Sequence, residues 1–595
     1  MQIYTEKFMA YAANAKAVNC GFSDETYIDF AEKTLRSLIA MGIQKPDGFI
    51  CDPFEAMGIT YRGRELERFY YHAAARFCGA LGQMILAGRM VEFAGELFRT
   101  YSYLMYILAY EFEPELYAEF WVKELVFAYE ALLKAGHTGL DPGIWEKVSW
   151  RKYGFHYFNN FFNSVAFALA SEACRIKAGL GGDVYFFDAW APVLFDKFDA
   201  KRGMFLEPGA PLSYDLVARQ QMLFAIQNGA SGEHVGKALE LCGRGAESSL
   251  YMQSSTGQMP FGGRTNQFLC MDAQLACYFE MMCNENIQNG EHRVAGIFKQ
   301  AAGKALMSTE PWIRMEPYRH IRQGFHPSLG HGVDSGGVYT VYGLLMASLM
   351  GTAYHDALKN NGLQCYEAPS DAGGYVFRTS DSFHKIFAAC GGYHLEIDTA
   401  GDPEKDATGL GRLHRKGIMP ETALSGSFAA EPSYSFAVEG IKPEAAAIGP
   451  AWINAEGSPA SLACSDRESL QSSVVILKEE KDGIAFIVTY RPDGGTWIEE
   501  RYSLAPDGLE YNVKGNQNGL HITVPVIMTD GAAKGIRYAD TDGPGVEYRD
   551  SVYKVVCDDY EYTGKFCANR NGIYEILKVR DLSIRLVLQK AVIYE

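Results

Sequence analysis

The spacing of apolar residues changes near residue 370 of this chain. Between residues 24 and 360, apolar positions recur every three or four residues, as in 65–88 and 114–136, and this is the period of amphipathic helices. From about residue 373 the apolar runs are short, alternate with polar positions and are separated by Gly, Asp and Pro, which is typical of β-strands joined by turns. The pattern predicts a helical N-terminal body and a β-rich C-terminal body.

The helical body favours a toroid of helical hairpins. We expect roughly ten to twelve helices with short Gly- and Pro-containing connections, which suits such a toroid better than a four-helix bundle. No repeat of fixed period accompanies them. In addition to helices in 65–88 and 114–136, we expect helices at 160–179, 213–228, 234–251, 266–284, 291–307 and 335–355.

The β-rich body favours a large antiparallel sandwich, because many short strands rich in β-branched and aromatic residues follow one another. The predicted strands are 373–381, 383–391, 393–399, 472–480, 483–492, 496–506, 508–515, 520–529, 553–562 and 583–595. We therefore expect a multidomain α+β chain. It has an N-terminal (α/α) toroid at 1–310, a bridging segment with the last toroid helix at 311–370, and an antiparallel β-sandwich at 371–595.

The net charge of the chain limits the classes of partner that it can bind. The 595-residue chain carries a formal net charge of −17 at pH 7, whereas nucleic-acid binding needs a basic face. We therefore expect no nucleic-acid partner, and an acidic oligosaccharide would have to meet a local basic pocket. Positive side chains concentrate at 312–331, which includes His331, and at 411–416. His331 either faces a cleft or caps the helix that follows, as polar side chains often do.

The cysteines and the N-terminal residues indicate the cellular compartment of the protein. The 13 Cys contain no CxxC pair, which indicates reduced, mostly buried thiols rather than a disulfide framework. The first residues lack the apolar segment of a signal peptide, and no apolar stretch is long enough to span a bilayer. We expect no membrane partner and a cytoplasmic location, unless a leader has been removed. The sequence leaves a monomer and a homo-oligomer open.

An Asn-rich aromatic run and a Tyr form the first candidate site. Asn159, Asn160 and Asn163 lie in the aromatic run 153–164. One of them could cap a helix, but an adjacent pair of amides also suits a substrate carboxylate. Tyr214 follows a Gly/Pro loop 54 residues after Asn160 (214 − 160). In a toroid this is about one helical hairpin later, so both loops could face one rim. The alternative is a Tyr that only packs.

Two further segments display polar side chains after glycines. Arg264, Asn266 and Gln267 follow Gly262 and Gly263. Arg264 could recognise a carboxylate bidentately or pair structurally with Asp272.

The two glycines around Leu410 predict a tight loop that displays Arg412 and His414. Flanking Arg residues would lower the pKa of this His and favour its neutral, basic form. The alternative is a surface loop with basic side chains.

Metal-ligating patterns are sparse. His384, His394 and Asp398, with Asp402 and His414, could assemble a structural zinc site across strands. Asp402, Glu404 and Asp406 alternate as in a calcium loop, but Ala407 stands where its turn glycine belongs. The sequence contains no HExxH, GxSxG or P-loop motif, so the corresponding enzyme classes lack support.

Taken with the Asn pair in FNNFFN, Tyr214 in PLSYD and a His in the sandwich, the architecture resembles the heparinase II/III-like polysaccharide lyases. The resemblance implies that Asn159 or Asn160 neutralises a uronate carboxylate, that Tyr214 acts as acid, and that His414 assists as base. Many members carry an H-x-H pair in the sandwich, one His catalytic and one binding zinc. The matching region here reads GGYHLEID, so His394 competes with His414 for the catalytic role.

The expected activity is a carbon–oxygen lyase that cleaves uronate-containing oligosaccharides by β-elimination. The chemistry needs no cofactor, although a structural Zn or Ca ion is compatible with the chain. One alternative is a glycoside hydrolase, which needs two carboxylates. The others are a uronate C5-epimerase and a non-catalytic carbohydrate-binding protein. The carboxylates available to a hydrolase are Glu207, Asp215, Asp272 and Asp334.

Overall fold

The protein divides into two compact units, each of which collects separate stretches of the chain. A computed structural model describes residues 3–54, 64–158, 162–334, 339–492 and 495–591. The helical unit contains residues 1–249, 268–320 and 335–366, and the β unit contains 250–267, 321–334 and 367–595. Two segments that the sequence analysis assigned to the toroid and the bridge therefore belong to the β unit.

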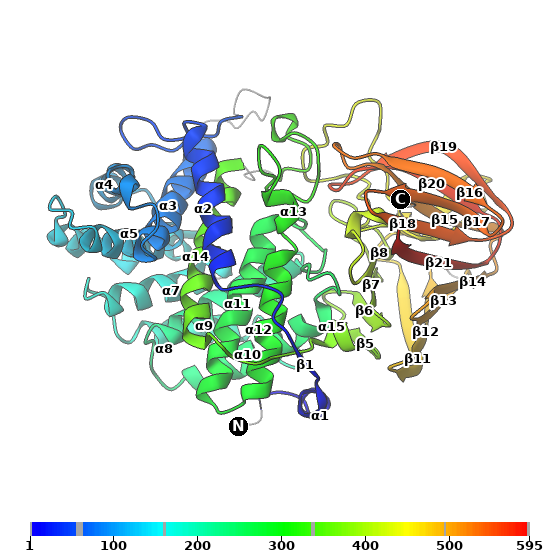
Figure 1. Ribbon diagram of the computed structural model, residues 1–595, viewed down its shortest axis with the longest axis horizontal. Coiled ribbons are helices and arrows are strands. Elements are labelled where there is room, and N and C mark those ends of the chain that lie inside the picture. Colours follow the sequence, from blue (N-terminus) through cyan, green and yellow to red (C-terminus); the bar gives the residue numbers. More distant parts are fainter. Residues whose placement is uncertain (1–2, 55–63, 159–161, 335–338, 493–494, 592–595) are drawn as a thin grey trace. The chain divides into compact units, whose positions relative to one another are not determined.

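Among the described residues, six helices form the inner ring of the helical unit, and Figure 1 labels them. Each packs against the next, and α14 packs against α3, which closes the ring. α9 and α11 are buried on nearly every face, as expected of helices surrounded by others. The inner helices are α3 (Arg64–Leu86), α5 (Val122–Lys134), α7 (Asn163–Lys177), α9 (Leu212–Gln227), α11 (Leu269–Gln288) and α14 (Tyr339–Ala357).

Outer helices pack on this ring. α2 (Glu25–Ala40) covers α14, α4 (Ala94–Tyr110) covers α3 and α5, α8 (Phe186–Phe195) covers α7, and α12 (His292–Met307) covers α11. Within the described ranges, no helix combines the length and apolar character that a bilayer span requires. The remaining helices are α1 (Glu6–Asn14), α6 (Phe155–Phe158), α10 (Val235–Met252), α13 (Glu310–Ile313) and α15 (Pro369–Ala372).

The helical unit also holds two small ribbons, in which β1 (Ala17–Val18) pairs with β4 (Cys365–Tyr366) and β2 (Phe198–Asp199) pairs with β3 (Met204–Phe205). Cys20 and Cys365 form a disulfide beside the first ribbon. The prediction of reduced thiols was wrong for this pair, because the ribbon brings together cysteines 345 residues apart. Ten of the other eleven thiols are buried, as predicted.

The β unit contains three antiparallel sheets that share one apolar core. One has the order β5 (Tyr375–Arg378), β6 (Lys385–Cys390), β7 (Tyr393–Asp398), β8 (Gly409–Arg415). A second has the order β10 (Pro459–Ser461), β9 (Gly449–Ile453), β15 (Asn518–Thr529), β20 (Ile573–Val579), β19 (Tyr560–Ala568). The third has the order β11 (Gln471–Glu480), β12 (Gly483–Arg491), β13 (Ile498–Ala505), β14 (Gly508–Gly515), β21 (Ser583–Lys590), β18 (Ser551–Val556), β17 (Gly543–Tyr548), β16 (Gly535–Asp540).

The predicted fold class, a helical toroid and an antiparallel β-sandwich, is confirmed, but two local predictions were wrong. The predicted strand 553–562 contains the turn between β18 and β19. The tight loop predicted around Leu410 is strand β8 instead. Gly411 is the extra residue of a β-bulge in that strand, and a Cβ there would lie 2.4 Å from the Phe261 ring. The glycine therefore permits close packing rather than a turn.

Candidate functional site

The start of α7 meets the loop before α9 at one end of the helical ring. Asn163, the first residue of α7, donates its backbone N–H to the Glu207 carboxylate at 3.3 Å. Glu207 opens the Gly/Pro loop that leads to Tyr214, the third residue of α9, which is half-buried. Asn163, at the end of the Asn-rich run, is therefore adjacent to the loop before Tyr214, as expected if the two share a rim. Asn159 and Asn160 themselves lie outside the described residues.

A buried ion pair fixes the first turn of α9. Asp215 accepts the backbone N–H of Phe205 at 2.6 Å and pairs with Arg219 through two bonds of 2.9 and 2.6 Å. Both side chains of the pair are almost fully buried. The next residue back along the helix, Tyr214, lies on a less buried face. The pair thus holds the first turn of α9 and leaves Asp215 fully engaged.

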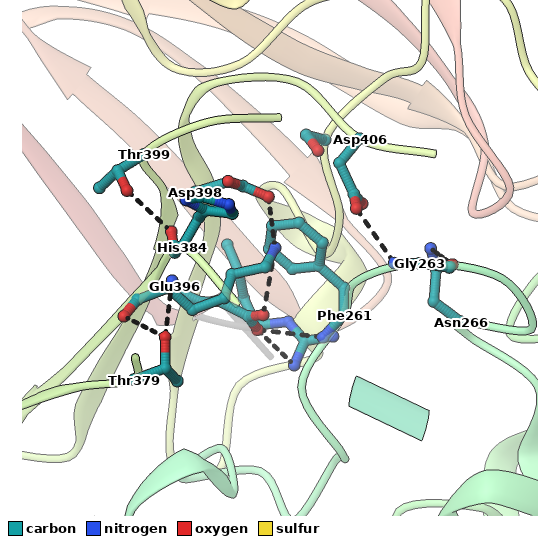
Figure 2. Close-up of polar contacts among 12 residues, drawn as sticks. Phe261, Gly263, Asn266, Thr379, His384, Glu396, Asp398, Thr399 and Asp406 are labelled. Carbon is teal, nitrogen blue, oxygen red and sulfur yellow. Dashed lines mark hydrogen bonds and ion pairs between the residues drawn. The ribbon is translucent and has the colours of Figure 1, made fainter. Parts of the chain in front are cut away.

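The polar face of the β5–β8 sheet forms a second candidate cluster, and this one lies in the β unit (Figure 2). Strand alternation sends apolar side chains to the core and charged ones to the opposite face. Lys385 and Asp398 are cross-strand partners with an ion pair of 2.9 Å, and Glu396 and Arg412 are partners at 3.2 Å. All four are buried.

The segment 250–267 covers this polar face. The backbone N–H of Phe261 donates to Glu396 at 3.1 Å, and that of Gly263 donates to Asp406 at 3.0 Å (Figure 2). The Phe261 ring lies 3.6 Å from the Lys385 ammonium, a favourable cation–π geometry. Arg412 donates to the Met259 carbonyl at 2.8 Å. The basic residues of the predicted loop thus anchor this segment to the sheet.

His414 lies beside Arg412 in the same anchor. Its Nδ1 is 2.7 Å from the Ser254 hydroxyl, and its Nε2 is 2.7 Å from the Ser425 hydroxyl. The ring has no exposed surface, and burial, with the Arg412 charge nearby, holds the pKa of His414 well below its usual value. The imidazole is therefore neutral and has both nitrogens hydrogen-bonded.

Three predicted polar residues lie at or beside a small pocket of the β unit. Asn266 donates to the Gly263 carbonyl at 2.9 Å, and Gln267 donates to the Ser425 carbonyl at 2.9 Å. Both line the pocket, whose free space is about 10 Å³, roughly the room for one water. Arg264, the third, is half-buried next to them in the chain.

The opposite wall of this pocket comes from a turn that the sequence analysis missed. Asn569, Arg570 and Asn571 line it, between β19 and β20. Arg570 pairs with Asp334 and donates to the Gly332 carbonyl at 2.7 Å. The Asn-Arg-Asn-Gly run between two predicted strands was the available signal, since such a run is typical of a turn.

His331 also joins chain segments within the β unit. Its Nε2 lies 2.9 Å from the Asn569 carbonyl oxygen, and its Nδ1 accepts the backbone N–H of Ala437 at 3.2 Å. Burial lowers the pKa of His331 to about 4, so the ring is neutral. It is only 2% exposed. The structure thus places His331 as a bridge between loops.

Burial also raises the pKa values of acidic residues in the second cluster. It raises the pKa of Glu396 to about 7 and that of Asp406 to about 6. Of the proposed metal ligands, Asp398 is paired with Lys385, His394 lies opposite His414, and His384 is half-buried in the turn before β6. Over the described part of the chain, no three His, Cys, Asp or Glu side chains gather as a metal ion would need.

No protein-family model matches the sequence, and no curated protein is significantly similar to it. Among solved structures, the chain is similar to a heparan sulfate lyase from Pedobacter heparinus (10% identity, TM-score 0.32, covering 99% of this chain and 87% of that chain). It is also similar to a glycosyl hydrolase family 88 protein from Bacteroides vulgatus (11% identity, TM-score 0.37, 56% and 99%). A third is a GH127 beta-L-arabinofuranosidase from Geobacillus stearothermophilus T6 (11% identity, TM-score 0.29, 97% and 99%). Likeness at this level leaves the activity to be argued from this chain's own residues.

Proposed function

We propose that this protein is a glycan-processing enzyme that cleaves uronate-containing oligosaccharides by β-elimination. The observation that carries the proposal is the contact between Asn163 and Glu207, which brings the first residue of α7 next to the loop that leads to Tyr214. Asn163 and Tyr214 lie in the first turns of two inner helices, α7 and α9, and the N-terminal end of a helix favours negative charge. An anionic sugar ring held there would meet amides and a phenol.

The proposed reaction uses Tyr214 for proton transfer. A tyrosinate takes the C5 proton of the uronate, and the electron pair moves into the carboxylate as an enolate dianion. Amide donors of Asn159 or Asn160 stabilise that charge. The electrons then form the C4–C5 double bond, the C4–O4 bond breaks, and the Tyr214 phenol returns its proton to O4. Tyr214 thus takes up one proton and gives one back, so no other residue has to supply or remove a proton.

His414 takes no proton in this proposal. Its ring has no exposed surface and both nitrogens are hydrogen-bonded, so it cannot reach a sugar without displacing Ser254 or Ser425. We assign it to positioning the segment 250–267 through Ser254. Arg412 has the same role.

Hydrolysis is the second candidate, and three of the four available carboxylates argue against it. A hydrolase needs an acid and a base or nucleophile free to act on the glycosidic bond. Asp215 is paired with Arg219 and Asp334 with Arg570, both in buried pairs. Glu207 is 6% exposed and accepts the N–H of Asn163. These three candidates are engaged in structural contacts, which favours the lyase.

The deciding experiment follows ultraviolet absorbance while the protein is mixed with a panel of uronic-acid oligosaccharides. β-Elimination creates a C4–C5 double bond conjugated to the carboxylate, so absorbance rises. Tyr214→Phe should lower the rate of the absorbance rise by about a hundredfold or more, because the proton transfer is lost. The matched control is Tyr106→Phe, whose Tyr is 52% exposed on α4.

Other outcomes would redirect the assignment. New reducing ends without absorbance would indicate hydrolysis. Deuterium from solvent at C5 of an uncleaved sugar would indicate epimerisation. Full activity of Tyr214→Phe would remove Tyr214 from the mechanism.

A further inference from the structure

A cluster of aromatic side chains lies on the helical unit beside the outer helix α8. The ring centroids of Trp150, His156 and Trp190 are separated by 5.0, 5.6 and 5.8 Å. Both Trp residues are half-buried and His156 is exposed. All three belong to the helical unit. The cluster therefore presents apolar ring surface and a polar imidazole to solvent.

Buried neighbours hold this cluster in place. Phe155 is buried and packs against His156 at 3.9 Å and against Trp190 at 5.5 Å. Earlier in the same segment, Tyr153 donates its hydroxyl to Glu172 on α7 at 2.6 Å. The segment that carries His156 is thus fixed against the helices, and a ligand would not have to order it.

A basic stretch of chain borders the rings. Residues 147–156 contain Lys147, Arg151 and Lys152 and no acidic residue. Lys152 is occupied, because its ammonium donates to the Leu108 carbonyl at 2.5 Å. Burial and the charge of Lys147 lower the pKa of Lys152, so these two cations lie near each other.

The other two cations are open to a ligand. Arg151 and Lys147 are exposed, and among the described residues neither side chain forms a hydrogen bond or an ion pair. The Arg151 guanidinium carbon lies 5.6 Å from the Trp150 ring, and the Lys147 ammonium lies 4.0 Å from the Tyr110 ring. A carboxylate could therefore reach both cations without displacing a protein partner.

Acidic residues occur nearby in the sequence but are not paired with these cations. Within the described ranges, neither Glu146 nor the acids at 111–115 form an ion pair with Lys147 or Arg151. On α8, Asp188 accepts the backbone N–H groups of residues 233 and 234, both at 3.1 Å. Lys147 and Arg151 thus meet solvent and its anions rather than a carboxylate of the protein.

We propose that this outer aromatic surface, made of Lys147, Trp150, Arg151, His156 and Trp190, binds an acidic sugar unit of an oligosaccharide. A guanidinium holds a carboxylate through two parallel hydrogen bonds, and aromatic rings supply apolar faces for the C–H groups of a sugar. The identity of the ligand rests on the proposed function. The surface extends that function with a second, non-catalytic binding site for the substrate class.

Calorimetric titration with a galacturonate hexamer tests the proposal, with maltohexaose as a neutral chain of equal length. The protein carries Asn160→Ala and Tyr214→Phe, which prevent cleavage and weaken binding at the proposed catalytic rim. The acidic hexamer should bind in about the 0.1–1 mM range, and maltohexaose about tenfold more weakly. Raising the salt concentration to about 0.5 M should weaken the acidic hexamer, because exposed charges are screened.

Two double substitutions in that protein separate local charge from net charge. Lys147→Gln with Arg151→Gln should weaken the acidic hexamer about tenfold. Lys45→Gln with Lys201→Gln removes the same charge from two exposed positions elsewhere on the helical unit and should leave the affinity within about twofold. All four positions are exposed, so both variants should fold, and thermal unfolding checks this.

Four results would overturn the proposal: no binding of the acidic hexamer, equal affinity for the two hexamers, unchanged affinity after the Lys147 and Arg151 substitutions, or an equal loss in the control. The outcome does not depend on cleavage. Selective loss of binding supports the surface even if no uronate is cleaved, and unchanged binding excludes it even if the protein is a lyase.

Discussion

At the scale of single residues, Arg412 shows how a charge is kept inside a protein. Its guanidinium has no exposed surface, yet it meets Glu396 at 3.2 Å and the carbonyls of Met259 and Ser425. Charged groups leave water only when such partners replace it. Because these partners come from β7 and from segments outside the sheet, Arg412 holds the tertiary structure of the β unit together.

Arg412→Met should therefore lower the free energy of unfolding of the β unit by about 3–5 kcal/mol, because the buried Glu396 would lose its closer cation and keep only Lys385 at 3.8 Å. Chemical denaturation measures the change. The matched control is Arg585→Met, at a side chain 44% exposed beside Asp507, where we expect a change under about 1 kcal/mol. Equal effects at the two sites would contradict this role for Arg412.

His414 can be tested by separating stability from turnover. His414→Gln should lower the free energy of unfolding by about 1–3 kcal/mol, because the shape and the partners of buried hydrogen bonds change. The kcat of the folded enzyme should stay within a few-fold of wild type. Thermal unfolding and activity measured below the transition give both values. A hundredfold loss of kcat with unchanged stability would instead make His414 a catalytic base.

At the scale of elements, strand β13 carries a buried acid among tyrosines. Glu500 has no exposed surface and accepts hydrogen bonds from the hydroxyls of Tyr502, at 2.9 Å, and Tyr511. Burial raises the pKa of Glu500 to about 7. The folded state thus keeps a proton that the unfolded chain releases near pH 4.5. Stability from this group is complete below pH 4.5 and is lost as the pH rises to about 7.

Glu500→Gln should remove this pH dependence. As the pH rises from 5 to 8, the free energy of unfolding of the variant should increase relative to that of wild type, by up to about 3 kcal/mol. Denaturation at a series of pH values measures the difference. Glu499→Gln, at a half-buried neighbour on the opposite face of the strand, should run parallel to wild type. A constant gap between Glu500→Gln and wild type would show that Glu500 is ionised throughout.

At the scale of the whole molecule, the disulfide bond leads to a prediction about which cysteines react. The Cys20–Cys365 disulfide links two distant stretches of the helical unit, and the other eleven cysteines are free. Alkylation of the denatured, unreduced protein should therefore label eleven thiols by mass, and reduction should raise the count to thirteen. In the native protein, exposed Cys464 should react first. Thirteen labels without reduction would place the pair in the thiol form.

The chain's own periodicities were sufficient for the fold class, because helix and strand patterns are local. Period 3.6 before residue 360 and period 2 after residue 373 mark the toroid and the sandwich. The same local reading placed Tyr214 at the mouth of a helix. It failed at β8, where Gly411 accommodates the distant Phe261 ring, a contact that no local pattern encodes.

The sequence by itself determined the fold class and which residues carry usable chemistry. Only the tertiary structure decided which of those residues are open to a ligand. Alternation in β7 and β8 predicts a charged face, but the segment 250–267 buries that face, together with Arg412 and His414. The ring of helices likewise creates a cavity that five separate helices line. The physical reason is that burial depends on what covers a surface, and the covering segments lie far away in the chain.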